Sequence, residues 1–260
     1  MINIINKTKE RLQNSVMAFW TLITTIIYTL VIGTLIMISS LFSSTGKFPF
    51  KLGCAWSWLL MKTNRVKIQV IGLEKFAREK SYVFISNHGS NLDPPAVALA
   101  IPQTLRFIGK SSLAKIPVFG WAAKSARLIF IDRSNNAKSI ETINKAIKDL
   151  KDGISAFFFA EGSRGINGVL QSFKKGGVVL AIKAKLPVIP ITIIGSYKLL
   201  PRSAIRIRPG ILKVIIGDPI DTSSYSDDDK DILLQKVRNV IEKTLGEYRN
   251  KIVVLDGCNR

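Results

Sequence analysis

The residues whose types and spacing best suit proton transfer are His88, the one histidine of the chain, and Asp93. The apolar run 82–85 followed by Asn-His-Gly-Ser-Asn is typical of a buried strand that ends in a turn, so we expect His88 in a loop at the strand's exit. A carboxylate bound to one imidazole nitrogen fixes the tautomer and stabilises the imidazolium, while the other nitrogen takes a proton. The plainer alternative is that Asp93 only caps the helix starting at Pro94 and that His88 is only a polar turn residue.

Charged loops follow two further apolar runs. Their residues are Asp132 and Arg133 after 129–131, and Glu161, Gly162, Ser163 and Arg164 after 157–160. Glycine lets a backbone approach a ligand closely, and the planar guanidinium of arginine suits phosphate. Loops at the carboxyl ends of neighbouring strands meet at one edge of an open α/β sheet, where such sheets bind ligands. We therefore expect these loops to join His88 at one site, with ordinary salt-bridged loop arginines as the alternative.

The pattern from Lys62 onward alternates short β-like runs with helical ones, which indicates an α/β fold. Because the strands are mostly continuous apolar runs, we expect a mixed, mostly buried central sheet of about seven strands flanked by helices. The expected strands are 66–70, 82–86, 105–108, 128–131, 156–160, 188–194 and 213–216, and the expected helices are 94–101, 139–150, 176–185 and 227–248. Ser226 would cap the last helix. Pro187 and Pro190 interrupt the sixth strand, for which an edge position is the simplest explanation.

No charged residue occurs between Arg11 and Lys47, and the stretch 16–42 is largely apolar. As a helix this stretch would be about 40 Å long, more than the hydrocarbon core of a bilayer at about 30 Å. We therefore expect residues 1–62 to form a membrane-embedded helical segment and residues 63–260 to form the α/β domain. The apolar region is too long for a signal peptide and no Ala-x-Ala site follows it. A buried helix of a soluble core is the remaining alternative.

Basic residues flank this stretch on both sides, at positions 7, 9 and 11 before it and at 47 and 51 after it. Both flanks favour the cytoplasmic side, and a single span would violate that preference at one end. Two helical arms in one leaflet, or one shallow helix, would satisfy it. The second arm would be 52–61, where Trp56 and Trp58 suit an interface. We expect a membrane-embedded segment with both flanks cytoplasmic.

The chain is strongly basic, with 38 Lys and Arg against 18 Asp and Glu and a formal net charge of +20. This excess predicts attraction to polyanions, whether nucleic acid, an anionic membrane surface or phosphorylated substrates and carriers. We expect no nucleic-acid partner, because the basic residues are scattered and no nucleic-acid motif is present. Cys54 and Cys258 are too few for a disulfide framework and lack metal-ligand spacing, so a reducing compartment and no metal site are expected.

Together these motifs resemble those of the glycerolipid acyltransferase family, in the family's order over roughly residues 50–220. The matching residues are Asn87, His88 and Asp93 (Asn-His-x4-Asp), Phe130, Ile131 and Arg133 (Phe-Ile-x-Arg), residues 159–164 (Phe-Pro-Glu-Gly-Thr-Arg), Pro187 and Pro190 (Pro-x-x-Pro), and, between the first two, Lys110, Leu113, Pro117 and Gly120. Three residues depart from the family pattern, namely Arg127 where glycine is common, Ala160 in place of proline and Ser163 in place of threonine.

The resemblance implies a role for each residue of these motifs. His88 would act as general base on an acceptor hydroxyl with Asp93 orienting it, and Lys110 with loop amides would stabilise the oxyanion. The residues implied in substrate binding are Asn87, Arg133, Glu161, Gly162, Ser163, Arg164 and Pro187. Among them, Arg133 and Arg164 would pair with the acceptor's phosphate while Glu161 orients an arginine. No covalent nucleophile is needed, and 162–165 is not a Gly-x-Ser-x-Gly elbow.

The reaction implied by the resemblance is transfer of a fatty acyl group from acyl-CoA or acyl carrier protein to the 2-hydroxyl of 1-acylglycerol 3-phosphate, which gives phosphatidate. It implies no cofactor beyond this acyl donor. A membrane lipid acceptor, an anionic membrane surface and a place on the cytoplasmic face of the inner or plasma membrane fit the apolar segment and the basic excess. The alternatives are a relative that acylates glycerol 3-phosphate or another lysolipid, and a non-catalytic basic module that binds membrane or nucleic acid.

Overall fold

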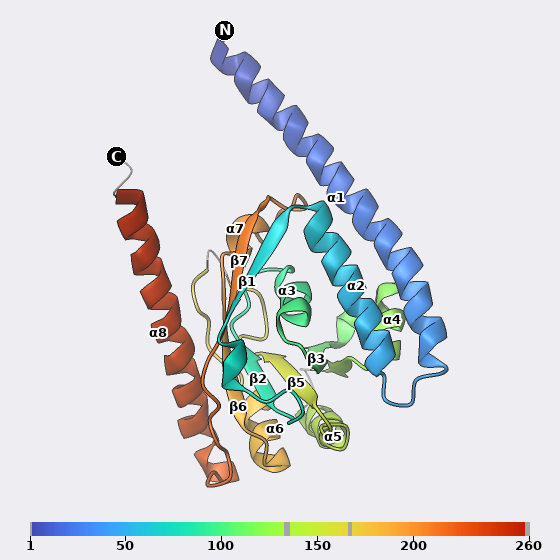
Figure 1. The fold of residues 1–260 in the computed structure, drawn as a ribbon, viewed down its shortest axis with the longest axis vertical. Coiled ribbons are helices and arrows are strands. Elements are labelled where there is room, and N and C mark those ends of the chain that lie inside the picture. Colours follow the sequence, from blue (N-terminus) through green and yellow to red (C-terminus); the bar gives the residue numbers. More distant parts are fainter. Residues whose placement is uncertain (1, 133–135, 166–167, 258–260) are drawn as a thin grey trace.

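The computed structural model describes residues 2–132, 136–165 and 168–257. The chain forms one mixed seven-stranded sheet with helices on both faces and a long helical hairpin at its N-terminus (Figure 1). The strands are β1 (Val66–Ile71), β2 (Val83–Ser86), β3 (Thr104–Lys110), β4 (Ile129–Ile131), β5 (Ile154–Phe159), β6 (Val188–Ile194) and β7 (Gly210–Ile216). This architecture confirms the predicted α/β fold with a mixed sheet.

The sheet has the order β1-β7-β6-β2-β5-β3-β4. Strands β2 to β6 pair in parallel with one another, whereas β7 runs antiparallel to β6 and parallel to β1. The carboxyl ends of five strands therefore meet at one edge of the sheet. The loops after β2, β4 and β5, which carry the predicted chemistry, all leave from this edge.

Each face of the sheet carries its own apolar core because side chains alternate along each strand. In β2, Phe84 faces one core together with Phe157 and Leu105, while Val83 and Ile85 face the other. The first core is covered by α2 (Lys47–Thr63) and α3 (Asp93–Ala100). The second core is covered by α5 (Asn136–Ile147), α6 (Gly176–Ala184) and α8 (Lys230–Gly257). The short helices α4 (Phe119–Ser125) and α7 (Ser196–Leu199) complete the fold, with 3-10 turns at Leu73–Lys75, Ser111–Lys115 and Asp227–Asp229.

The strand with two prolines, β6, is not an edge strand, because it lies between β2 and β7. The antiparallel ladder with β7 starts at Ile191, and Val188 makes a separate bridge with Ile220. Between these pairings Pro190 offers no N–H, and its carbonyl accepts the Gly217 amide at 2.8 Å. A central strand tolerates proline here because the neighbouring chain leaves the ladder at that position.

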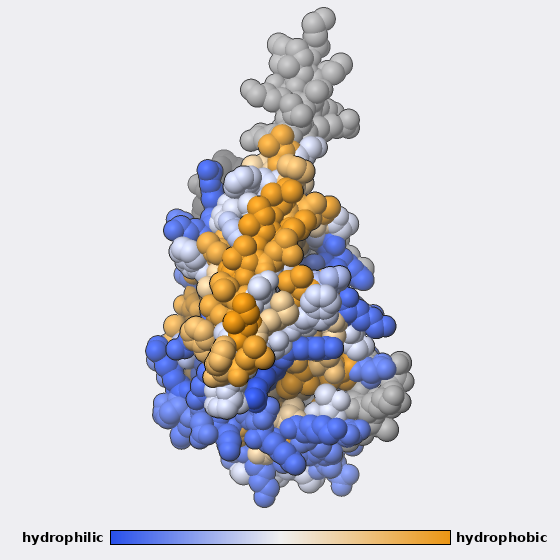
Figure 2. Space-filling model, turned by 90° about the vertical axis from the view of Figure 1, so that its right-hand side faces the viewer, coloured by the Kyte–Doolittle hydropathy of each residue, from blue (hydrophilic) through white to orange (hydrophobic). Residues whose placement is uncertain are grey.

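The N-terminal hairpin consists of α1 (Ile2–Ser40) and α2, which lie side by side and antiparallel (Figure 1). Polar contacts join the two helices, with Thr21 donating to Asn64 at 2.8 Å and Tyr28 lying 2.8 Å from Thr63. Among the described residues, one helical stretch, Asn14–Ser40, is long and apolar enough to cross a membrane. Its outward face is a stripe of exposed apolar side chains (Figure 2), formed by Phe19, Trp20, Ile23, Ile26, Ile27, Leu30, Val31, Leu35 and Ile38.

The hairpin shares a core with the α/β domain. Phe50, Leu60 and Met61 of α2 are buried in the cluster that also holds the sheet residues Phe84 and Leu105. The predicted second arm, 52–61, is thus part of α2, and it packs on α3 as well as on α1. This packing fixes the long apolar helix against the domain that carries His88.

Candidate active site

The turn between β2 and α3 brings His88 and Asp93 together, as the sequence predicts. Asp93 is the first residue of α3 and is fully buried, and its Oδ2 lies 2.8 Å from His88 Nδ1. The same oxygen accepts the backbone amides of Gly89 at 2.7 Å and Ser90 at 2.8 Å. Asp93 therefore holds the amides of the loop as well as the imidazole. It does not cap α3, because the N-cap position is Leu92 and no side-chain cap hydrogen bond is formed there. A carboxylate acceptor places the proton on Nδ1, which leaves Nε2 as the basic nitrogen.

Glu161 holds the backbone of His88 from the other side. Its Oε1 accepts the His88 amide at 2.6 Å, and its Oε2 accepts the Gln171 amide at 2.8 Å. Burial raises the pKa of Glu161, and the two amide hydrogen bonds oppose that rise. The sequence predicts that Glu161 orients an arginine, but within the described part of the chain its carboxylate binds backbone amides and forms no ion pair with an arginine.

The loop that follows Glu161 closes against the His88 turn. The Gly165 amide donates to the His88 carbonyl at 2.7 Å. A Cβ at position 165 would lie 2.7 Å from the Val169 carbonyl oxygen and 3.2 Å from a Glu161 carboxylate oxygen, so only glycine allows this approach. The backbone of His88 is therefore fixed at both its amide and its carbonyl by the 161–165 loop.

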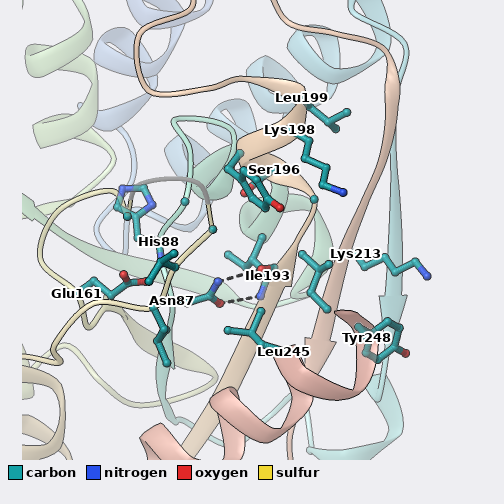
Figure 3. Close-up of a pocket in the computed structure, with 18 of the residues that line it drawn as sticks. Asn87, His88, Glu161, Ile193, Ser196, Lys198, Leu199, Lys213, Leu245 and Tyr248 are labelled. Atoms are coloured by element: carbon teal, nitrogen blue, oxygen red, sulfur yellow. Dashed lines mark hydrogen bonds between the residues drawn. The ribbon is translucent and has the colours of Figure 1, made fainter. Parts of the chain in front are cut away.

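Two further contacts set the position of the His88 turn. The imidazole stacks on Phe159, with ring centroids 4.2 Å apart and planes inclined by 27°. Asn87 donates its amide to the Ile193 carbonyl at 2.9 Å and accepts the Ile193 amide at 2.8 Å (Figure 3). The polar groups of Asn87 therefore join β2 to β6, an internal role that the sequence alone did not indicate.

His88 lies at one end of a cavity of about 520 Å³. Asn87 and Glu161 border the same end, and residues 193–199 around α7 form one wall (Figure 3). Lys213, Leu245 and Tyr248 line the cavity farther from the imidazole (Figure 3). A cavity of this size with a partly apolar lining can hold a substrate that has an aliphatic part, and it would place that substrate next to the imidazole.

Three further predicted site residues, Gly162, Ser163 and Arg164, are not among the residues that line the His88 cavity. Gly162 and Ser163 line a second cavity, of about 890 Å³, that shares Glu161 with the first. Arg164 donates to the carbonyl of Arg202 at 3.3 Å, and Arg202 donates to the carbonyl of Arg164 at 3.5 Å. Arg133 lies outside the described residues.

Two predicted residues are not brought to the imidazole. Lys110 ends β3 with an exposed side chain and is not among the residues lining the His88 cavity. Pro187 precedes the first residue of β6, and its carbonyl accepts the Val83 amide at 3.0 Å, at the amino end of β2. Since His88 follows the carboxyl end of β2, Pro187 lies at the opposite edge of the sheet.

Gln171 and Phe159 contact the site without having been predicted as functional residues, and Arg202 was expected only as one of several basic residues that could contact anionic lipid or the phosphates of the donor. Gln171 contributes only its backbone amide, and Arg202 pairs with Arg164 across 38 positions. Phe159 belongs to one of the sequence motifs, but the motif did not predict that its ring stacks on the His88 imidazole. These contacts depend on the tertiary fold rather than on local spacing.

Comparison with known proteins identifies the family of this chain. Residues 67–194 match the Acyltransferase family. The chain is 34% identical over 181 residues to the chloroplastic 1-acyl-sn-glycerol-3-phosphate acyltransferase BAT2 of Brassica napus, covering 69% of this chain and 51% of that protein. It is 31% identical over 183 residues to the 1-acyl-sn-glycerol-3-phosphate acyltransferase of Saccharomyces cerevisiae, covering 69% of this chain and 60% of that protein.

The fold is similar to that of the 1-acyl-sn-glycerophosphate acyltransferase PlsC of Thermotoga maritima, with a TM-score of 0.78 and 23% identity over 92% of this chain and 97% of that one. The matched region spans only about half to three fifths of the two curated relatives. The family match, the curated relatives and the His88–Asp93 site agree. The chain belongs to the acyltransferase family, among whose members are 1-acyl-sn-glycerol-3-phosphate acyltransferases.

Proposed function

We propose that the protein transfers a fatty acyl group from acyl-CoA or acyl carrier protein to the 2-hydroxyl of 1-acylglycerol 3-phosphate, forming phosphatidate. The observation that carries this proposal is the buried Asp93 carboxylate on His88 Nδ1, beside a cavity of about 520 Å³. The names of the curated relatives support the choice of acceptor.

In the proposed mechanism, Nε2 of His88 takes the proton of the acceptor hydroxyl as its oxygen attacks the thioester carbonyl. Asp93 stabilises the imidazolium that forms, and a base positioned in this way contributes about 10² to 10⁴ in rate. Collapse of the tetrahedral intermediate breaks the C–S bond, and the imidazolium returns the proton to the thiolate. The step balances without an acyl-enzyme. Lys110, the expected oxyanion donor, is not included because it does not line the His88 cavity.

The phosphate of the acceptor would bind near Arg164. Arg164 and Arg202 each donate to the other's backbone carbonyl, and neither guanidinium group forms an ion pair with a carboxylate among the described residues. Guanidinium groups bind phosphate through paired hydrogen bonds. Arg133, Gly162 and Ser163 stay proposed contributors to the same site.

The apolar stripe of α1 supports a membrane location. An acceptor that carries an acyl chain resides in the bilayer, so a site fixed to an apolar hairpin meets its substrate there. We propose that the protein works on the cytoplasmic face, where anionic lipids would attract its basic surface. Glycerol 3-phosphate or another lysolipid is the alternative acceptor. We do not propose the non-catalytic alternative or a nucleic-acid partner, because the basic residues are scattered along the sequence and form no nucleic-acid motif.

The proposal is tested by offering the detergent-solubilised protein three labelled acceptors, namely lysophosphatidate, glycerol 3-phosphate and a zwitterionic lysolipid, each with acyl-CoA and with acyl carrier protein. We expect label in phosphatidate. Transfer to another acceptor alone would keep the reaction class and change the substrate. Absence of transfer from both donors to all three acceptors would contradict the proposal.

A further inference from the structure

The second cavity, of about 890 Å³, is a basic groove along α6. Four lysines line it, and a carboxylate at the start of the α8 region faces them. These residues are Lys174, Lys175, Lys183, Lys230 and Asp227. The groove starts at the loop of Glu161, Gly162 and Ser163, which also borders the His88 cavity, and it reaches the first residue of α8.

Three of the four lysines of this groove form no ion pair among the described residues, while the carboxylates of Asp227 and Glu161 also line it. Lys175 forms an ion pair with Asp231 at 2.8 Å. Lys174, Lys183 and Lys230 have no carboxylate partner among the described residues, and the carboxylate of Glu161 is occupied by two backbone amides. The glycines at the start of α6, Gly176 and Gly177, add the positive end of a helix dipole to the same groove. Several cations in one cavity repel each other unless an anion binds between them.

The groove lies on the face of the sheet away from the apolar hairpin. Its walls include Ile143 of α5, Val179 of α6 and Phe158 of β5, which belong to or adjoin the core covered by α5, α6 and α8. The hairpin helix α2 packs instead on the opposite core. A ligand of this groove would therefore bind on the face of the sheet opposite the one that the hairpin covers.

We propose that this groove binds the phosphate groups of a nucleotide-bearing thioester donor of the coenzyme A type, an inference that rests on the proposed acyl transfer. A donor of that class carries a diphosphate and a third phosphate on its ribose, which matches a groove with four lysines better than a single phosphate does. The volume lies within the range of small-molecule sites, about 300 to 1,000 Å³. The long arm between the nucleotide and the thioester would pass the 161–163 loop to reach His88.

The test compares the wild type with the double variant Lys183→Glu/Lys230→Glu, and with Lys67→Glu as the control. Lys67 is exposed on β1, at the other edge of the sheet from β4. Calorimetry measures binding of adenosine 3′,5′-bisphosphate and of free CoA to each solubilised protein. Kinetics compare acyl-CoA with an acyl N-acetylcysteamine thioester, which carries no phosphate, at several concentrations of lysophosphatidate.

We expect the double variant to lose roughly 10- to 100-fold in affinity for CoA and in kcat/KM with acyl-CoA. The kcat/KM with the phosphate-free thioester and the KM for lysophosphatidate should stay at wild-type values, and Lys67→Glu should change none of these quantities. Equal losses with both donors, a raised KM for lysophosphatidate alone, or unchanged CoA binding would overturn the proposal. If charge reversal unfolds the protein, Lys183→Gln/Lys230→Gln provides the same comparison. CoA binding that depends on these lysines in a protein that transfers no acyl group would refute the proposed function and leave the groove assignment intact.

Discussion

Replacing Asp93 with asparagine separates the charge of this residue from its geometry. Oδ2 of Asp93 accepts three N–H groups, those of His88 Nδ1, Gly89 and Ser90. In Asp93→Asn the backbone amides of Gly89 and Ser90 repel the side-chain NH₂ group, so the side-chain oxygen stays at the position that Oδ2 occupies in the wild type. The imidazole then still donates from Nδ1, so its tautomer is preserved while the charge of the carboxylate is lost. The NH₂ group takes the place of Oδ1, a buried atom that has no hydrogen-bond partner among the described residues.

The size of the expected loss follows from this geometry. A hydrogen bond to a charged group contributes about 1.5–3 kcal/mol and a neutral one about 0.5–1.5 kcal/mol, so the imidazolium loses about 1–2 kcal/mol of stabilisation. This corresponds to a decrease of about 5- to 30-fold in kcat/KM. The loss should be well below the effect of His88→Ala, which removes a general base worth about 10² to 10⁴ in rate.

The assay is initial-rate acyl transfer by wild type, Asp93→Asn and His88→Ala, with thermal unfolding to establish that each variant is folded. If Asp93→Asn loses as much activity as His88→Ala while it is folded, the carboxylate sets the tautomer and the argument from the two loop amides is refuted. If Asp93→Asn has wild-type activity, the proposed imidazolium does not form.

Three other predictions concern residues around this centre. Because burial raises the pKa of Glu161, ionising this residue costs more free energy in the folded than in the unfolded protein. The stability of the wild type relative to Glu161→Gln should therefore fall as pH rises through that raised pKa. Thermal unfolding of both proteins from about pH 4 to pH 8 measures this difference, and a wild-type advantage that grows with pH would contradict the prediction. Arg164→Ala removes a charged hydrogen-bond donor, so it should lower kcat/KM by about tenfold for phosphate-bearing acceptors and by less for a neutral lysolipid. Equal losses of kcat/KM with both kinds of acceptor would exclude Arg164 from the phosphate site. Arg127 has a φ of 59°, and its side chain donates to the Ser44 carbonyl. Both Arg127→Gly and Arg127→Ala lose this hydrogen bond, but only glycine relieves the backbone strain, of about 1 kcal/mol. Denaturant unfolding should therefore show Arg127→Gly to be more stable than Arg127→Ala, and the reverse order would show that this backbone is not strained.

The sequence predicted local features of the site well because they depend on local spacing. The turn that joins His88 to Asp93 spans five positions, and the apolar run before it marks its strand. The rule that loops meet at the carboxyl edge of parallel strands also placed Glu161 and Gly162 beside this turn. The same reasoning explains Arg127, since the left-handed backbone at this position suits the glycine that is common in the family.

The contacts that hold the site could not be predicted, because they join distant parts of the chain. Glu161 binds the His88 amide across 73 positions, and Asn87 binds Ile193 across 106. The prolines suggested an edge position for β6, yet β6 lies between β2 and β7. Pro190 is tolerated there because the β6–β7 ladder begins only at Ile191, which the sequence does not show. Pro187 belongs to a recognisable motif, but strand direction places it at the edge opposite His88.

The helical segment shows the same division between local and tertiary information. Absence of charge between Arg11 and Lys47 was enough to predict a long apolar helix. The polar contacts that join α1 to α2, such as Thr21 with Asn64, required the folded hairpin. The packing of Phe50 and Met61 into the sheet core was likewise invisible in the hydropathy pattern.

The most direct measurement of the central claim is conversion of labelled lysophosphatidate to phosphatidate by purified wild type and by folded His88→Ala, each with acyl-CoA. If His88 is the base of a direct transfer, the wild type forms labelled phosphatidate, no acylated protein is trapped, and the variant loses about 10² to 10⁴ of the rate. Phosphatidate formed by His88→Ala at the wild-type rate, or an acyl group trapped on the wild-type protein during turnover, would contradict the account.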